Sequence, residues 1–122
     1  MNDTTTPGIG QPRTVLDGVG HSLLIEIVDG GIVILDAMDD ASRVSMRKDE
    51  AEILHAFLSV SLKMPHREGF SEDLRNGRRL SLEHEGSPHV RITSSEACLD
   101  IHPSSWEPLL CEISLLLPRL KD

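Results

Sequence analysis

Aromatic side chains are nearly absent from this chain of 122 residues, which has two Phe, one Trp and no Tyr. Leu, Ile and Val must therefore fill the core, and the hydrophobic content still reaches an ordinary 39%. A chain of this length suits one compact domain that buries roughly two-thirds of its unfolded surface. The composition predicts a single folded domain with an aliphatic core.

Cysteine is also scarce. Cys98 and Cys111 form no C-x-x-C pair, and two thiols do not make a disulfide framework in a chain of this size. We expect both to be buried free thiols, which fits a reducing cytoplasm. The first residues lack a basic stretch followed by an apolar one, so no signal peptide is expected. The apolar runs also fall far short of the ~20 residues that a membrane helix needs.

Positive charge is in deficit, because 12 Lys and Arg stand against 20 Asp and Glu and give a formal net charge of −8. This balance argues against a general binder of nucleic acids or membrane surfaces, since both need a positive field. It is compatible with a soluble protein whose partner is basic or neutral.

The most informative stretch is residues 44–62. Its first residues alternate as on a strand, and the apolar residues that follow recur at spacings of three and four, which predicts a helix over about 48–63. The expected core face of this helix consists of Ile53, Leu54, Phe57, Leu58 and Leu62. Acidic residues in the first turn, Glu50 among them, complement the helix dipole.

A similar pattern of core residues recurs later in the chain. A gapless shift of 55 residues places Leu99 on Val44 and aligns the core positions of a second helix with those of the first. The second helix is expected to begin near Ser104, which is spaced from Glu107 as in a capping box. Its expected buried face consists of Leu109, Leu110, Ile113, Leu116, Leu117 and Leu120. This repeated pattern predicts an internal duplication.

Three strands are expected before each helix. In the first copy Asp29-Gly30-Gly31 supplies the positive φ angles that a tight hairpin needs. We therefore predict an α+β fold of two β-β-β-α units, with antiparallel sheets covered by two amphipathic helices in one compact domain. The expected limits are a flexible tail at 1–21, the first unit at 22–64, a polar basic linker at 65–79 and the second unit at 80–122.

The tandem β-β-β-α order resembles the architecture shared by the PC4, Whirly and Pur-alpha families. The resemblance covers residues 22–120 and rests on the hairpin glycines and the two strand–helix joins, without a family sequence motif. It implies binding of single-stranded nucleic acid, which these families achieve with basic and aromatic residues on an open sheet face. In this chain the only aromatic residues are Phe57, Phe70 and Trp106.

A metal site is an alternative for the second unit. His84 and His89 flank its hairpin turn, and Cys98 and His102 lie on its third expected strand, which would bring zinc-type ligands together. The spacing matches no recurrent zinc motif, and polar strand residues more often face solvent. The sequence also lacks a G-x-S-x-G elbow and a Cys at a basic helix start. We therefore expect no metal, no cofactor, no catalytic residue and no enzymatic activity.

The basic segment at residues 63–79 holds five Lys or Arg against three acids and is expected to contain a loose helical turn near 70–74. It is either a solvated loop or a surface that contacts phosphate or an acidic partner. The lone Trp at the start of the second helix either caps the core or anchors a subunit interface. The candidate partner-binding residues are Arg75, Arg78, Arg79, Arg91 and Trp106.

These features predict a small acidic cytoplasmic protein that acts in binding or regulation through protein–protein interaction, with no membrane partner. A homodimer is expected, because first-unit strands that are apolar on both faces would leave an exposed patch on a monomer. One alternative is a regulator that binds single-stranded nucleic acid through the four arginines. Another is an acidic inhibitor that imitates nucleic acid with the carboxylates of the first unit.

Overall fold

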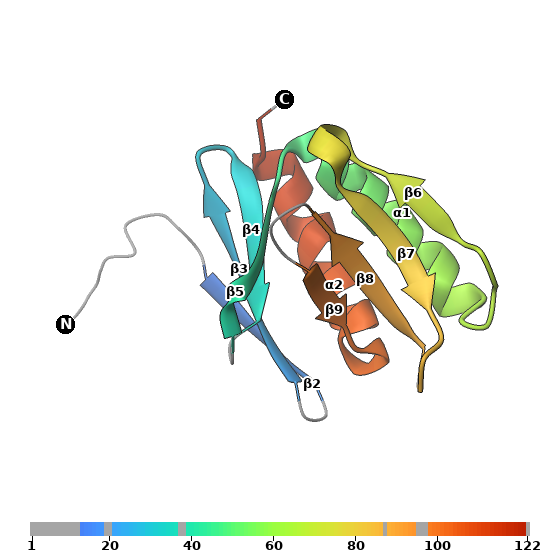
Figure 1. The fold of residues 1–122 in the computed structure, drawn as a ribbon. Coiled ribbons are helices and arrows are strands. Elements are labelled where there is room, and N and C mark those ends of the chain that lie inside the picture. Colours follow the sequence, from blue (N-terminus) through green and yellow to red (C-terminus); the bar gives the residue numbers. More distant parts are fainter. Residues whose placement is uncertain (1–12, 19–20, 37–38, 87, 95–97, 122) are drawn as a thin grey trace.

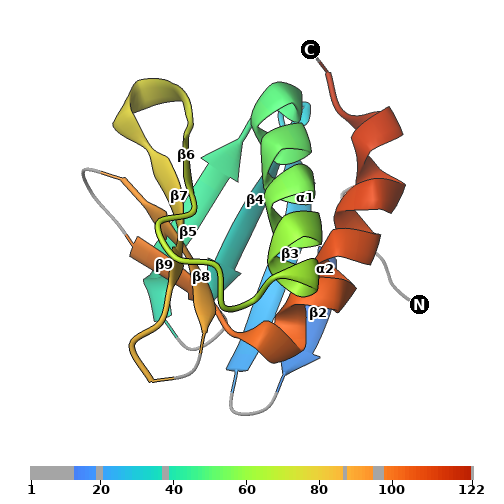
Figure 2. The same ribbon diagram turned by 90° about the vertical axis from the view of Figure 1, so that its right-hand side faces the viewer.

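The computed structural model describes residues 13–18, 21–36, 39–86, 88–94 and 98–121. These residues form two antiparallel sheets and two α-helices, so the predicted α+β class is confirmed. The first sheet has the strand order β2-β3-β4-β5 and the second has the order β6-β7-β8-β9. Figure 1 shows the two sheets side by side, and Figure 2 shows the two helices next to each other on one side of the molecule.

The first sheet is a meander in which each strand pairs with the next. Its strands are β2 (Arg13–Gly18), β3 (His21–Val28), β4 (Gly31–Asp36) and β5 (Asp39–Met46). Between β3 and β4, Asp29 and Gly30 both have positive φ, at 52° and 80°. These angles are those of a two-residue hairpin turn whose twist matches that of the strands, so the predicted turn is confirmed.

The second half repeats this order of elements. Its strands are β6 (Ser71–Asp73), β7 (Arg79–Glu83), β8 (His89–Thr93) and β9 (Cys98–Ile101), again paired in sequence. The helices are α1 (Lys48–Lys63) and α2 (Pro103–Leu116), with 3₁₀ turns η1 (Arg75–Gly77) and η2 (Leu117–Arg119). The first helix therefore has the predicted bounds.

Each sheet has one strand more than predicted. β2 lies within the expected tail at 1–21, and β6 lies within the expected linker at 65–79, where the helical turn predicted near 70–74 is wrong. Both are edge strands, and all three residues of β6 are exposed, so no apolar alternation marks it in the sequence. The halves are thus β-β-β-β-α units, and their origin by duplication stays a prediction.

One hydrophobic core joins the two halves. It includes Leu23, Ile25, Ile34, Val44, Leu54, Leu58, Leu80, Ile92, Leu99, Leu109 and Ile113. The first helix contacts both sheets and α2, while α2 also packs against β2, the edge strand of the other half's sheet. Leu62 is exposed, so its predicted place on the core face is wrong. Phe70 instead contributes an aromatic contact, stacked on Phe57 with 4.1 Å between ring centroids.

Two further expectations about burial change with the structure. Cys98 and Cys111 are both free but exposed, whereas the sequence predicts buried thiols. Val33 and Leu35, on the face of β4 away from the helices, are only 3% and 8% exposed within the single chain. The exposed patch that motivates the predicted homodimer therefore does not include these two residues. Within the described part of the chain, neither helix is long and apolar enough to cross a membrane.

Candidate functional site

A cavity of about 490 Å³ lies where the β3–β4 hairpin, the end of β5 and the start of α1 meet η1. Four of its lining residues are basic and two are acidic, which reverses the charge balance of the whole chain. The charged lining residues are Asp29, Arg47, Glu50, Arg75, Arg78 and Lys121. We refer to this cavity as the basic pocket.

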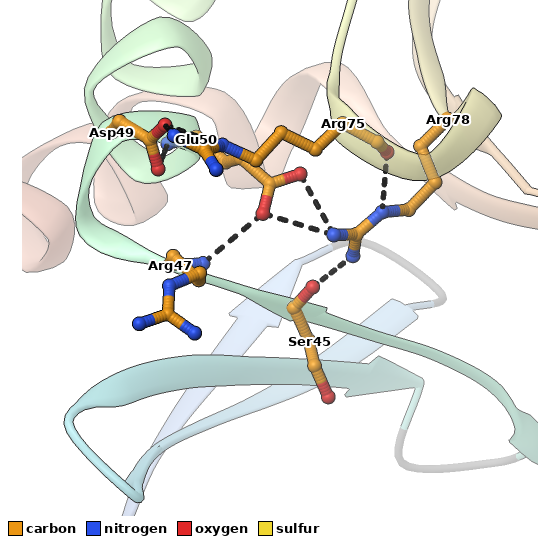
Figure 3. A network of polar contacts seen from close by, with 6 residues as sticks. All are labelled: Ser45, Arg47, Asp49, Glu50, Arg75 and Arg78. Atoms are coloured by element: carbon orange, nitrogen blue, oxygen red, sulfur yellow. Dashed lines mark hydrogen bonds and ion pairs between the residues drawn. The ribbon is translucent and has the colours of Figure 1, made fainter. Parts of the chain in front are cut away.

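The inner wall of the pocket is an ion pair between Glu50 and Arg78 (Figure 3). The Arg78 Nη2 group donates to both carboxylate oxygens of Glu50, at 2.9 and 2.7 Å. Its Nη1 group donates to the carbonyl oxygen of Ser45, and its Nε group donates to the carbonyl oxygen of Arg75 at 3.3 Å. The Glu50 side chain is only 1% exposed and that of Arg78 14%, so the pair is nearly removed from water.

Glu50 faces inward because of its place on α1. It precedes the core residues Leu54 and Leu58 by one and two helical turns, which puts all three on one face. Its carboxylate also accepts the backbone N–H of Arg47 at 3.2 Å and so satisfies a donor at the helix start. An acid on an apolar helix face requires a buried partner, and this pattern is the sequence signal that would have found the pocket.

A second ion pair lies at the pocket rim, between Asp49 and Arg75. The Arg75 Nη2 and Nε groups lie 2.6 and 2.7 Å from Asp49 Oδ2, and the N–H of Glu50 donates to Oδ1 at 3.0 Å. Desolvation acts to raise the pKa of Asp49, but the hydrogen bonds and the charge of Arg75 outweigh it, so the pKa lies below its ordinary value. Arg75 is largely exposed, so this pair is open to solvent.

Two cations of the pocket remain unpaired among the described residues, Arg47 and Lys121. The Arg47 guanidinium points away from the Glu50 carboxylate, although its backbone N–H is bonded to it (Figure 3). Lys121 reaches the pocket because its backbone N–H donates to the carbonyl oxygen of Gly30 at 2.8 Å. Sequence reasoning missed both residues, because they converge only in the folded chain.

The hairpin glycines shape the pocket floor. A Cβ atom on Gly31 would lie 2.4 Å from the backbone oxygen of Met46, so only glycine fits this approach of β4 to β5. A Cβ atom on Gly30 would lie 3.1 Å from the side chain of Lys121. The small residues thus leave room for the pocket and for the lysine that flanks it.

The structure divides the four predicted arginines into two pairs. Arg75 and Arg78 meet at the basic pocket, whereas Arg79 and Arg91 lie on the outer face of the second sheet. There Arg79 is 3.0 Å from Asp73. Arg91 is 2.7 Å from Asp100, whose hydrogen bond raises the pKa of this guanidinium. The four arginines therefore do not form one continuous basic surface.

Trp106 lies in the core rather than on a surface. Its side chain is buried, and its indole N–H donates to the carbonyl oxygen of Ile101 at 2.9 Å. The role of core cap fits these contacts, and the role of a partner anchor does not.

His84 and His102 of the alternative metal site have partners elsewhere, whereas His89 and Cys98 lie 4.0 and 3.9 Å from the same Asp100 oxygen. A ring nitrogen of His84 lies 3.0 Å from the carbonyl oxygen of Pro65, and His102 accepts the N–H of Ser104 as the N-cap of α2. This cap replaces the predicted capping box. Partial desolvation and the charge of Asp100 raise the pKa of Cys98, which disfavours the metal-binding thiolate. In the described ranges, no group of three or more His, Cys, Asp or Glu is placed to hold a metal ion.

Comparison of this chain with models of known protein families and with curated proteins finds no match. The resemblance to the PC4, Whirly and Pur-alpha architecture stays a prediction about topology. The function must therefore be argued from the basic pocket itself.

Proposed function

We propose that this chain is a small acidic binding protein without enzymatic activity, which acts through protein–protein interaction at the basic pocket. The observation that carries the proposal is a pair of cations, Arg47 and Lys121, that have no carboxylate partner among the described residues and line a cavity of a chain with net charge −8. A basic pocket in an otherwise acidic protein attracts the negatively charged part of a partner and steers its approach.

A protein partner fits the arginines better than single-stranded nucleic acid does. Each of the four arginines in that alternative has a carboxylate partner, namely Asp49, Glu50, Asp73 or Asp100. A phosphate backbone would have to displace these carboxylates or lie beside them, which costs electrostatic free energy. The buried aromatic residues Phe57 and Trp106 are also unavailable for stacking on bases.

Site-specific photo-crosslinking in cells tests this proposal. A photoreactive residue replaces Arg75 at the pocket rim in one variant, and Thr93 on the outer face of the second sheet in a matched control. We expect a discrete protein crosslink at position 75 that position 93 does not give. Equal crosslinking at both positions, or crosslinking of position 75 to nucleic acid alone, would contradict the proposal.

The proposal includes a cytoplasmic location and a homodimer. Free exposed thiols such as Cys98 and Cys111 persist in a reducing compartment, which supports the location. Leu62, Met64 and Leu115 are exposed large apolar side chains that a contact between two copies would cover. Sedimentation equilibrium at micromolar concentration decides the assembly, because a single species at 13.5 kDa would exclude the dimer.

A further inference from the structure

The carboxylates of Glu50 and Asp49 accept hydrogen bonds from only some of the donors at the basic pocket. The Glu50 carboxylate accepts from the N–H of Arg47, the N-cap of α1, and from Arg78, and Asp49 accepts from Arg75 and from the N–H of Glu50. Two of the four cations, Arg75 and Arg78, are therefore paired with carboxylates within the chain. Only the side chains of Arg47 and Lys121 remain as cations without a carboxylate partner among the described residues.

From this arrangement we infer that the basic pocket binds a carboxylate side chain within an acidic peptide segment, which is held by Arg47 and Lys121. The inference rests on the proposed function and names the chemistry of the partner. A carboxylate carries one negative charge and accepts hydrogen bonds from a guanidinium or an ammonium group.

The charges of the pocket favour a carboxylate over a phosphate. Arg78 neutralises Glu50 at the inner wall, and Asp49 neutralises Arg75 at the rim. The other charged lining residues are the cations Arg47 and Lys121 and the anion Asp29, which leave a formal charge of +1 in the pocket. A single carboxylate balances this formal charge, whereas a doubly charged phosphate exceeds it.

The size and the walls of the pocket favour a peptide over a free ion. A volume of about 490 Å³ holds several residues rather than a single small anion. Ile32, Val33 and Met46 supply apolar wall next to the charged groups, which suits the methylene groups of an acidic side chain. Gly30 and Gly31 add no side chains of their own to the hairpin side of the pocket, where the stem of Lys121 lies against Gly30.

Fluorescence anisotropy with two labelled peptides tests the inference on the full chain. One peptide alternates Glu with Ser, and its control replaces each Glu by Gln. We expect saturable binding of the Glu peptide that weakens as salt rises, and no binding of the Gln peptide. Arg47→Ala and Lys121→Ala should each weaken binding by roughly tenfold, because each removes a charge-assisted hydrogen bond.

Matched variants separate the pocket from general charge. Arg43→Ala removes an exposed arginine from the same strand as the pocket wall, and Lys63→Ala removes an exposed lysine from the far end of α1. Neither residue lines the pocket, so both variants should bind as the parent does. Circular dichroism of Arg47→Ala and Lys121→Ala verifies that the fold persists. Equal losses in all four variants would overturn the inference.

Inorganic phosphate provides the remaining arm of the test. Binding of phosphate at submillimolar concentration without binding of the Glu peptide would overturn the inference in favour of a phosphate site. A protein crosslink at position 75 together with no affinity for the Glu peptide would leave the proposed function standing and refute this inference alone.

Discussion

The two strand–helix junctions of this protein share a backbone plan and differ in what they bury. In α1 and α2 alike, the third helical residue is buried, and it is Glu50 in the first helix and Ser105 in the second. The next residue is buried in both helices as well, and it is Ala51 in the first and Trp106 in the second. One junction thus places a charge inside the protein, and the other places a large ring there.

This difference explains why the first junction opens into a polar pocket. The buried Glu50 requires a cation, and it recruits Arg78 across 28 positions of sequence together with the 3₁₀ turn that carries it. At the second junction the indole of Trp106 fills the space and bonds to the strand directly before the helix. A buried charge at a position that is otherwise part of the core thereby creates a candidate site.

Removal of the ring should have the largest effect on stability. Trp106→Ala is expected to lower the free energy of unfolding by about 3–5 kcal/mol, because it leaves a cavity in a closed core. Urea titration measures the loss, and Trp106→Phe, which keeps a ring, should lose less. A loss below about 0.5 kcal/mol for the alanine variant would show that the second junction is not filled by the indole.

Removal of Arg78 at the first junction should have the second-largest effect on stability. Arg78→Ala is expected to cost about 3 kcal/mol, because the Glu50 carboxylate is left buried without its partner. Arg79→Ala is the matched control, since its exposed pair with Asp73 contributes only about 0–1 kcal/mol. The double variant Glu50→Leu/Arg78→Met should recover most of the loss. If the double variant is as unstable as Arg78→Ala, the loss of stability does not come from an unpaired Glu50 carboxylate.

Ser105 holds the position in α2 that Glu50 holds in α1, and its substitution should stabilise the protein instead of destabilising it. The hydroxyl group of Ser105 is buried without a hydrogen-bond partner among the described residues. Ser105→Ala is therefore expected to raise the free energy of unfolding by roughly 1 kcal/mol, because it removes an unsatisfied polar group and adds a better helix former. Thermal unfolding followed by circular dichroism measures the change. A lower melting temperature would mean that the hydroxyl has a partner.

The smallest effect concerns the exposed pair at the pocket rim. In Arg75→Ala the pKa of Asp49 should rise toward its ordinary value of 3.8, because the main opposing charge is lost. Since the native pKa is lowered, the pair stabilises the fold above the unfolded pKa, and this contribution disappears as the pH falls through the native pKa. Carboxyl NMR titration of both proteins measures the shift. An unchanged pKa would show that backbone hydrogen bonds alone set its value.

The sequence predicted those parts of the fold that have a strong local signal. The bounds of α1 follow from apolar spacing, and the Asp29-Gly30 turn follows from residues that tolerate positive φ. β6 escaped prediction because it is three exposed residues whose strand character comes only from pairing with β7. β2 likewise owes its place to the edge of a sheet that it completes.

The candidate site was predicted only in part. Arg75 and Arg78 stood out as members of the single basic segment, but their partners lie more than 25 positions away on α1. Glu50 has two roles, as an acid at a helix start and as a member of the apolar face, and the first role concealed the second. Lys121 joins the pocket only through a backbone bond to the first hairpin. Such convergence is a property of the tertiary fold.

The packing of α2 against β2 has a consequence for how the chain is made. The first sheet emerges from the ribosome before the helix that covers its edge, and the Lys121 contact with the first hairpin forms only after α2 has emerged. A nascent chain that lacks α2 exposes apolar residues of the first sheet to chaperones and proteases. Truncated products that lack α2 should therefore be degraded rapidly, and resistance to proteolysis should appear only after α2 has been synthesised.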